Sequence, residues 1–265
     1  PGIIATGKVV PLGDLGVDTS PFLENLLAPY TIDGNVYGIP KDFNTLALHY
    51  NKDLFDEAGV EYPNAEDTWD TLAEKIRGVA ALGDEVKGIC FPASFDRFGA
   101  FAFATGWSPF DAEGNSNLQA ENLRAAVEWY TRLVQEGVAV QPSDIGAGWT
   151  GDCLASDNVG IAIEGAWILG FLRDNAPNLQ YGTAPMPIGP SGERGNFIYT
   201  VAYGINADSP NQEAAVKVLN ALTSEEAQQW VLQQGLAIPS RSAIADNPYF
   251  DEETPEAVAN RIVFE

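Results

Sequence analysis

Short apolar runs alternate with longer amphipathic stretches along the 265-residue chain. Val36–Ile39 and Leu46–Tyr50 are rich in β-branched, aromatic and aliphatic residues, the composition of buried strands. Residues 40–45 lie between them as a polar crossing with one aromatic side chain. Polar groups between two buried strands are typical of a loop that faces either a ligand or solvent.

Helical periodicity is clear in Trp69–Leu82 and Leu123–Glu136, where apolar side chains recur every three to four positions. Further helices are expected at 52–58, 98–105, 210–222 and 223–235, and further strands at 88–91, 159–163, 181–186 and 197–206. Strands that alternate with helices predict an α/β fold with mostly parallel sheets.

Composition excludes several classes of function. Hydrophobic residues make up 45% and charged residues 19%, so the chain can bury a core and has the length for one large or two modest domains. The formal net charge of −23 is opposite to what phosphate binding requires, which excludes nucleic acid as a partner. An acidic membrane surface is unfavourable for the same reason.

Cysteine and histidine are scarce. With two cysteines and one histidine, neither a zinc site nor any other metal site is predicted. Cys90 and Cys153 fit a disulfide and two buried free thiols equally well. His49 has apolar neighbours in a strand, so we interpret it as a structural residue.

The glycines Gly146, Gly148 and Gly151 have the spacing of a dinucleotide-binding fingerprint. Residues 141–144 before them are poor strand formers, and the segment after them is too short for the helix that such a site needs. We therefore expect a flexible loop here, and no cofactor.

Three carboxylates, Asp42, Asp96 and Glu164, could converge on one site. Glycosidases use two such groups at a defined separation. Carboxylates also accept hydrogen bonds from sugar hydroxyls or from the backbone, and both interpretations stay open at this point.

Aromatic residues recur beside turn residues. A sugar site combines a flat aromatic face with fixed polar partners. Core packing is the default for any one aromatic, but Trp167 follows a strand end and a glycine, which favours a binding role. The aromatic candidates are Phe43, Phe95, Trp149, Trp167, Tyr199 and Tyr203.

Four segments, in this order, resemble the bacterial and archaeal extracellular solute-binding proteins of the sugar-binding type, whose maltose-binding-protein-like members serve ATP-driven importers. They are Asp33–Gly59 (DGNVYGIPKDFNTLALHYNKDLFDEAG), Gly160–Trp167 (GIAIEGAW), Val201–Pro210 (VAYGINADSP) and Gly235–Arg241 (GLAIPSR).

The resemblance implies a two-lobe α/β fold of the periplasmic-binding-protein type II, with a ligand cleft between the lobes and hinge crossovers. Lobe one is expected at residues 1–45 and 203–242, and lobe two at 46–202 and 243–265. The resemblance begins part-way into the family's first lobe, so we expect that a signal segment and the opening βαβ units are not in this chain.

The implied function is capture of a sugar or oligosaccharide by hinge closure and delivery to the membrane permease of an ABC-type importer. No enzymatic activity, cofactor or metal is implied, and the expected protein is an extracytoplasmic monomer, in the periplasm or lipid-anchored at the cell surface. Two alternatives stay open: a carbohydrate-active enzyme that uses Asp42 and Glu164, or the same fold binding a polyamine, peptide or phosphodiester.

In the family, the tryptophan of the G-x-W motif commonly stacks on the sugar. Lys41 departs from the apolar or aromatic residue that is commoner at its position. The ligand-binding residues implied here are Asp42, Phe43, Asn44, Ser94, Phe95, Asp96, Arg97, Trp149, Glu164, Trp167, Tyr199, Tyr203 and Arg241.

Overall fold

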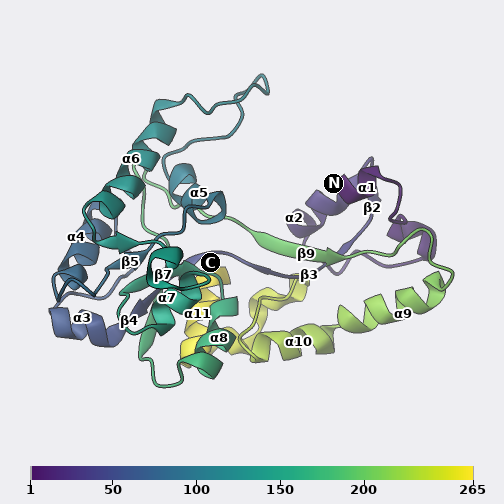
Figure 1. Cartoon of the computed structure of the whole chain (residues 1–265). Helices are drawn as coiled ribbons and strands as arrows, with labels where there is room; N and C mark the ends of the chain where they lie inside the picture. Colours follow the sequence, from purple (N-terminus) through teal and green to yellow (C-terminus); the bar gives the residue numbers. More distant parts are fainter. Residues whose placement is uncertain (1, 265) are drawn as a thin grey trace. The chain divides into compact units, whose positions relative to one another are not determined.

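The computed structural model describes residues 2–264, which divide into two compact units (Figure 1). Unit 1 comprises the chain up to Asn44 together with Ile198–Glu252, and unit 2 comprises Thr45–Phe197 together with the chain from Glu253 onward. The second and third boundaries lie at 197/198 and 252/253, where the sequence led us to expect 202/203 and 242/243. The second boundary differs because the strand Tyr199–Tyr203 pairs entirely within unit 1.

The described residues of unit 1 form several short helices, the longer helices α9 and α10, and four strands. Its elements are α1 (Gly2–Ala5), η1 (Leu12–Leu15), α2 (Glu24–Leu27), η2 (Ala28–Tyr30), β1 (Thr31–Ile32), β2 (Asn35–Val36), β3 (Ile39–Asn44), β9 (Tyr199–Tyr203), α9 (Gln212–Leu222), α10 (Glu225–Gln233), η4 (Ser242–Asp246) and η5 (Pro248–Asp251). Its hydrophobic core contains Leu12, Val17, Phe22, Ile39, Ile205 and Leu219.

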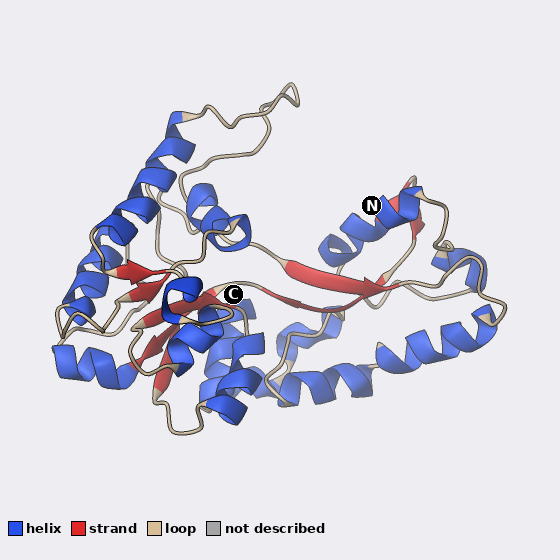
Figure 2. Ribbon diagram, in the orientation of Figure 1, coloured by secondary structure: helices blue, strands red, loops and turns tan. Residues whose placement is uncertain are grey.

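The main ribbon of unit 1 pairs β3 with β9 in antiparallel register, from Ile39 opposite Tyr203 to Asn44 opposite Tyr199 (Figure 2). The register shifts between Pro40 and Asp42, where proline has no N–H to donate. The sequence predicted a polar loop at 40–45, and this prediction is wrong for residues 40–44. Local pattern could not reveal the strand, because its partner lies more than 150 residues later in the chain.

Unit 2 contains the larger sheet. Its elements are β4 (Ala47–Asn51), α3 (Lys52–Ala58), α4 (Trp69–Ala80), β5 (Ile89–Cys90), α5 (Phe95–Phe103), α6 (Glu121–Gln135), β6 (Ala139–Val140), η3 (Pro142–Ile145), α7 (Thr150–Ala155), β7 (Ile161–Glu164), α8 (Trp167–Asn175), β8 (Tyr181–Ala184) and α11 (Pro255–Phe264). The helix α7 begins inside the glycine-rich segment, so the expectation of a flexible loop is wrong from Thr150 onward.

The strand order of this sheet is β6-β5-β7-β4-β8. β5 runs parallel to β6 and β7, whereas β4 runs antiparallel to both β7 and β8. The expectation of mostly parallel sheets is therefore wrong for the described strands. Two parallel neighbouring strands must be joined by a crossover connection within the unit. The chain enters unit 2 from unit 1 just before β4, so no such connection precedes this strand.

A disulfide joins β5 to α7, between Cys90 and Cys153. Both cysteines are fully buried in a small apolar cluster with Val140 and Val159. Of the two possibilities left open by the sequence, the structure contains the disulfide. It fixes the helix that begins at Thr150 to the middle of the sheet.

His49 has the structural role that its apolar neighbours indicate. It is fully buried in β4, its Nε2 lies 3.1 Å from the backbone oxygen of Glu164, and its Nδ1 lies 3.1 Å from the hydroxyl of Thr183. Burial lowers the pKa of His49 to about 4. Among the described helices, none combines the length and apolar character that crossing a bilayer requires.

Candidate functional site

A buried carboxylate organises the candidate site in unit 2. Glu164 is the last residue of β7, and only 1% of its surface is exposed. Its Oε2 accepts hydrogen bonds from Arg97 Nη2 at 2.6 Å and from the indole Nε1 of Trp167 at 2.7 Å, and its Oε1 accepts from the hydroxyl of Thr150. Burial raises the pKa of Glu164, an effect that the guanidinium of Arg97 opposes.

Arg97 is held on several sides at once. Its Nε donates to the backbone oxygen of Ile163 at 3.1 Å, and its Nη1 donates to Asp96 Oδ2 at 2.8 Å. Two carboxylates therefore share one guanidinium. The Asp96 side chain is 59% exposed, whereas that of Arg97 is 12% exposed, so the carboxylate is the charged group open to solvent.

Trp167 begins α8 and is partly exposed. A side chain at Gly165 would place its Cβ 2.5 Å from the indole ring, so the ring lies directly against the backbone at this glycine. The guanidinium carbon of Arg97 lies 5.7 Å from the ring centroid, within range of a cation–π interaction. The ring nitrogen and the ring face are thus both fixed.

The start of α5 carries the remaining candidates next to Arg97. Ser94 is the N-cap residue of this helix, and its backbone oxygen accepts from Phe98 N. Phe95 is 51% exposed, although its ring makes edge-to-face contacts with four other aromatic rings. It therefore presents an aromatic surface to solvent while being held by its neighbours.

Trp149 precedes α7 and is also partly exposed. Its Nε1 donates to Asp152 Oδ1 at 3.1 Å, and its ring lies edge to face against Phe171, with centroids 4.9 Å apart. Thr150, the next residue, reaches Glu164. The chain therefore links Trp149 to the Glu164 cluster through adjacent backbone.

In unit 1, three candidates follow one another in β3. Asp42 forms an ion pair with Lys41, and its backbone oxygen accepts from the Thr200 hydroxyl at 2.8 Å. Phe43 and Asn44 are 7% and 5% exposed, and Phe43 exchanges two backbone hydrogen bonds with Ile238. Two other candidates, Tyr199 and Tyr203, occupy the paired strand, and Tyr203 is 36% exposed.

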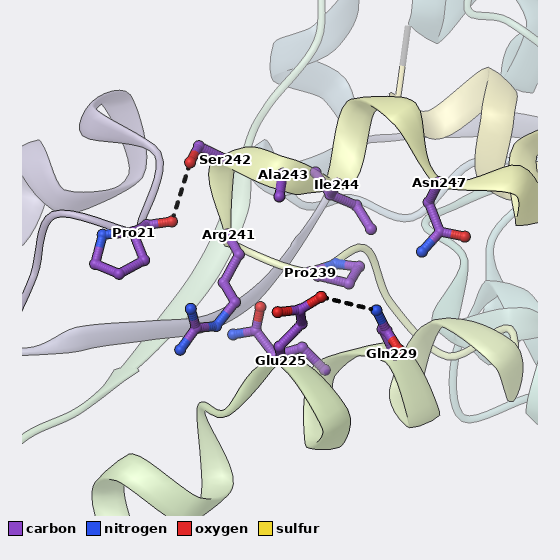
Figure 3. A pocket seen from close by; sticks show the side chains of 10 residues that line it. Pro21, Glu225, Gln229, Pro239, Arg241, Ser242, Ala243, Ile244 and Asn247 are labelled. Atoms are coloured by element: carbon purple, nitrogen blue, oxygen red, sulfur yellow. Dashed lines mark hydrogen bonds between the residues drawn. The ribbon is translucent and has the colours of Figure 1, made fainter.

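Arg241 lies elsewhere in unit 1, in a small pocket of about 90 Å³ between α10 and η4 (Figure 3). Its Nε donates to the backbone oxygen of Thr223 at 3.0 Å, and its guanidinium stacks 5.0 Å from the ring centroid of Phe22. These contacts join Arg241 to Thr223 at the end of α9 and to Phe22 in the segment before α2, and its ligand-binding role stays a prediction. The pocket is lined by Pro21, Glu225, Gln228, Gln229, Pro239, Arg241, Ser242, Ala243, Ile244 and Asn247.

The structure thus joins Asp96, Arg97, Glu164 and Trp167 in one network of hydrogen bonds. Sequence reasoning missed Thr150, which completes the hydrogen bonding of the buried carboxylate. The sequence signal that could have identified Thr150 is its position directly after Trp149, a candidate binding residue.

Comparison with known proteins gives a family and a fold. Residues 1–259 match the family described as bacterial extracellular solute-binding protein. A protein of Brucella abortus (strain 2308), named as a binding protein without a stated ligand, is 30% identical over 77% of this chain and 51% of its own length. An arabinooligosaccharide-binding protein of Halalkalibacterium halodurans is 26% identical over 88% of this chain and 54% of its own length.

Two solved structures illustrate the fold. The substrate-binding protein Lmo0181 of Listeria monocytogenes, in complex with cycloalternan, superposes with a TM-score of 0.88 at 22% identity, covering 99% of this chain and 68% of that one. A glycerophosphocholine complex of UgpB from Mycobacterium tuberculosis gives a TM-score of 0.84 at 21% identity, covering 97% and 67%. At such identities the likeness establishes the fold, which is that of two-lobe α/β solute-binding proteins. The chain spans about half the length of the curated relatives it matches.

Proposed function

We propose a sugar-capturing role from one premise: the chain belongs to the family of bacterial extracellular solute-binding proteins. In this proposal the protein binds a sugar or oligosaccharide outside the cytoplasm and delivers it to the permease of an ABC-type importer. The observation that carries the proposal is Trp167, a partly exposed indole that Glu164 and Gly165 hold in place. Arg97 lies against its ring and is paired with the solvent-exposed carboxylate of Asp96.

This combination suits a neutral sugar. A flat aromatic face packs against the apolar CH face of a sugar ring, and a fixed carboxylate accepts hydrogen bonds from its hydroxyls. The relatives and neighbours named above include an arabinooligosaccharide-binding protein and a cycloalternan complex, which supports this class of solute.

An anionic solute fits less well. The guanidinium of Arg97 is already shared by Asp96 and Glu164, so an incoming phosphate would have to compete with two carboxylates. The glycerophosphocholine complex of UgpB shows that the fold accepts a phosphodiester, and this ligand is therefore a necessary control.

Chemistry on the bound sugar is not part of the proposal. Glu164 accepts hydrogen bonds on both oxygens and is almost fully buried, and Asp42 is paired with Lys41 in the other unit. Family members named here are binding proteins. The expectation that hinge closure traps the ligand between two lobes stays a prediction.

The test is thermal unfolding of the purified protein against mono- and oligosaccharides, with glycerophosphocholine, spermidine and a tripeptide as controls. A ligand at a hundred times its dissociation constant adds about 2.7 kcal/mol. At about 2–4 °C per kcal/mol, the midpoint should rise by roughly 5–11 °C. Trp167→Ala should abolish the rise, whereas Trp230→Ala, which removes an indole that is 58% exposed in unit 1, should preserve it.

The outcomes separate the alternatives. A rise with a sugar that is recovered unchanged by chromatography supports a binding protein, whereas steady consumption of that sugar supports the enzyme. A rise only with glycerophosphocholine, spermidine or the peptide would keep the fold and reject the sugar.

A further inference from the structure

The short helix α7 connects the disulfide to the candidate site. It packs against β7, the strand that ends at Glu164 (Figure 1). Its first residue, Thr150, donates its hydroxyl hydrogen to Glu164. Cys153 follows Thr150 by three residues, so both side chains lie on one face of the helix. That face is turned inward, because Thr150 is 2% exposed and Cys153 is fully buried.

The disulfide joins this face of α7 to the strand beside β7. Cys90 of β5 is paired with Ala162 of β7, and Glu164 follows Ala162 by two residues. The bond from Cys90 to Cys153 therefore holds α7 close to the end of the strand that carries the carboxylate.

Local structure alone holds α7 weakly. The helix spans six residues, Thr150–Ala155, whereas isolated helices shorter than roughly 12–15 residues are marginal in water. Its position in the unit therefore depends on its buried contacts. Besides Thr150, the buried side chains of this helix are those of Cys153 and Leu154, and the disulfide supplies the covalent attachment to the sheet.

Glu164 passes this constraint on to Arg97 and Trp167. Its Oε1 accepts from Thr150, and its Oε2 accepts from the guanidinium of Arg97 and from the indole of Trp167. Without the hydroxyl of Thr150, Oε1 of a buried carboxylate loses this donor, which is costly in a buried site. The carboxylate plane could then turn about its last side-chain bond, and Oε2 would no longer be fixed for the indole.

We propose that Thr150 is a positioning residue of the candidate site, held on Glu164 by the disulfide of α7. Oxidation of Cys90 and Cys153 therefore completes the hydrogen-bond network around Trp167. A ligand contact at Trp167 rests on the proposed function, whereas the coupling between the disulfide and the indole does not. Reduction breaks the Sγ–Sγ bond and gives two thiols, while dithiothreitol supplies two electrons and two protons and closes to its own disulfide.

The experiment follows the indole N–H of Trp167 by nitrogen–proton correlation NMR of the purified protein, with no sugar added. The chain has six tryptophans, and the Trp167 signal is the one missing from the spectrum of Trp167→Phe. An ionised carboxylate is a stronger acceptor than its protonated form, so this signal reports the pH at which Glu164 titrates. The other ionisable groups on the elements around Glu164 are unchanged in the variants below; they are Asp96, Arg97, His49 and Asp152.

Thr150→Val replaces the hydroxyl by a methyl group of similar size. Loss of a donor to the ionised form raises the pKa of Glu164, so the titration midpoint of the Trp167 signal should rise by about one pH unit. Thr150→Ser keeps the hydroxyl and should titrate as the wild type does. The control Thr105→Val removes a hydroxyl that donates to the backbone oxygen of Ala102, and it should leave the midpoint unchanged.

The disulfide is removed in two ways, by Cys90→Ala with Cys153→Ala and by refolding the wild type in dithiothreitol. Both forms should shift the midpoint in the same direction as Thr150→Val. Since the disulfide is inferred to act through Thr150, adding Thr150→Val to the double variant should shift the midpoint no further.

The outcomes decide each part of the inference. A wild-type midpoint in Thr150→Val would overturn the positioning role. A wild-type midpoint in both forms that lack the disulfide would overturn its part in the site. Loss of cooperative unfolding in both forms would do the same, because the bond would then support the fold of unit 2 as a whole. Failure of every sugar in the thermal assay would reject the proposed function and leave these NMR shifts as they are.

Discussion

Loss of the Cys90–Cys153 disulfide should lower the stability of unit 2 by a large and predictable amount. The two cysteines are 63 residues apart, so the bond closes a long loop in the unfolded chain. The chain-entropy relation gives about 4 kcal/mol at 25 °C for a loop of this length. At about 2–4 °C per kcal/mol, reduction should lower the unfolding midpoint by roughly 8–16 °C.

The assay is thermal unfolding of the oxidised protein and of protein reduced and refolded under a thiol reductant. Both sulfurs are buried in an apolar cluster, so Cys90→Ala with Cys153→Ala is the matched variant that adds no polar group. The double variant should unfold near the reduced wild type, slightly lower because two buried sulfur atoms are lost. Its midpoint should not respond to the reductant.

Two results would refute this reasoning. Labelling of two free thiols in unfolded, unreduced protein would show that the disulfide does not form. An intact disulfide whose reduction shifts the midpoint by less than about 2 °C would show that loop closure is not the source of its stabilisation.

Two further predictions concern buried ionisable groups. In Glu164→Gln a single amide oxygen replaces the carboxylate that three donors now contact, so the free energy of unfolding measured in urea should fall by about 3 kcal/mol. The control Glu136→Gln, which removes the exposed ion pair with Arg77, should lower it by at most about 1 kcal/mol. Equal losses for the two variants would contradict the buried network. Burial lowers the pKa of His49 from 6.5 to about 4 in the folded protein, so between these pH values the unfolded chain binds a proton that the folded chain does not. The free energy of unfolding should therefore fall by about 3 kcal/mol as the pH drops through this window. His49→Gln should make this decline shallower. If urea unfolding gives equal pH slopes for the two proteins, the lowered pKa of His49 is refuted.

Local pattern was sufficient for the elements whose stability is local. The helix α4 begins after Thr68, whose hydroxyl accepts from Thr71 N, and buries Leu72, Ile76 and Val79 on one face. Asn51 caps α3, and Gly59 ends it in a left-handed conformation. These features depend on neighbours within one or two turns, so the sequence contains all the information they need.

Strand pairing required the tertiary structure. Whether residues 40–44 form a loop or a strand depends on β9, which lies far along the chain. The direction of β4 in its sheet likewise depends on how the chain enters unit 2 rather than on the composition of the strand. Periodicity reports which side chains are buried, but it carries no record of the partner that buries them.

The candidate site divides in the same way. Motifs in the sequence pointed to Asp96, Arg97, Glu164 and Trp167, and no spacing indicated that the carboxylate of Glu164 accepts hydrogen bonds from both Arg97 and Trp167. The role of Thr150 arises only because α7 packs against β7. Sequence therefore determined the residue types and the helices that carry them. The tertiary structure decided which groups share hydrogen bonds, because a hydrogen bond acts over a few ångströms and only folding brings residues far apart in the chain within that distance.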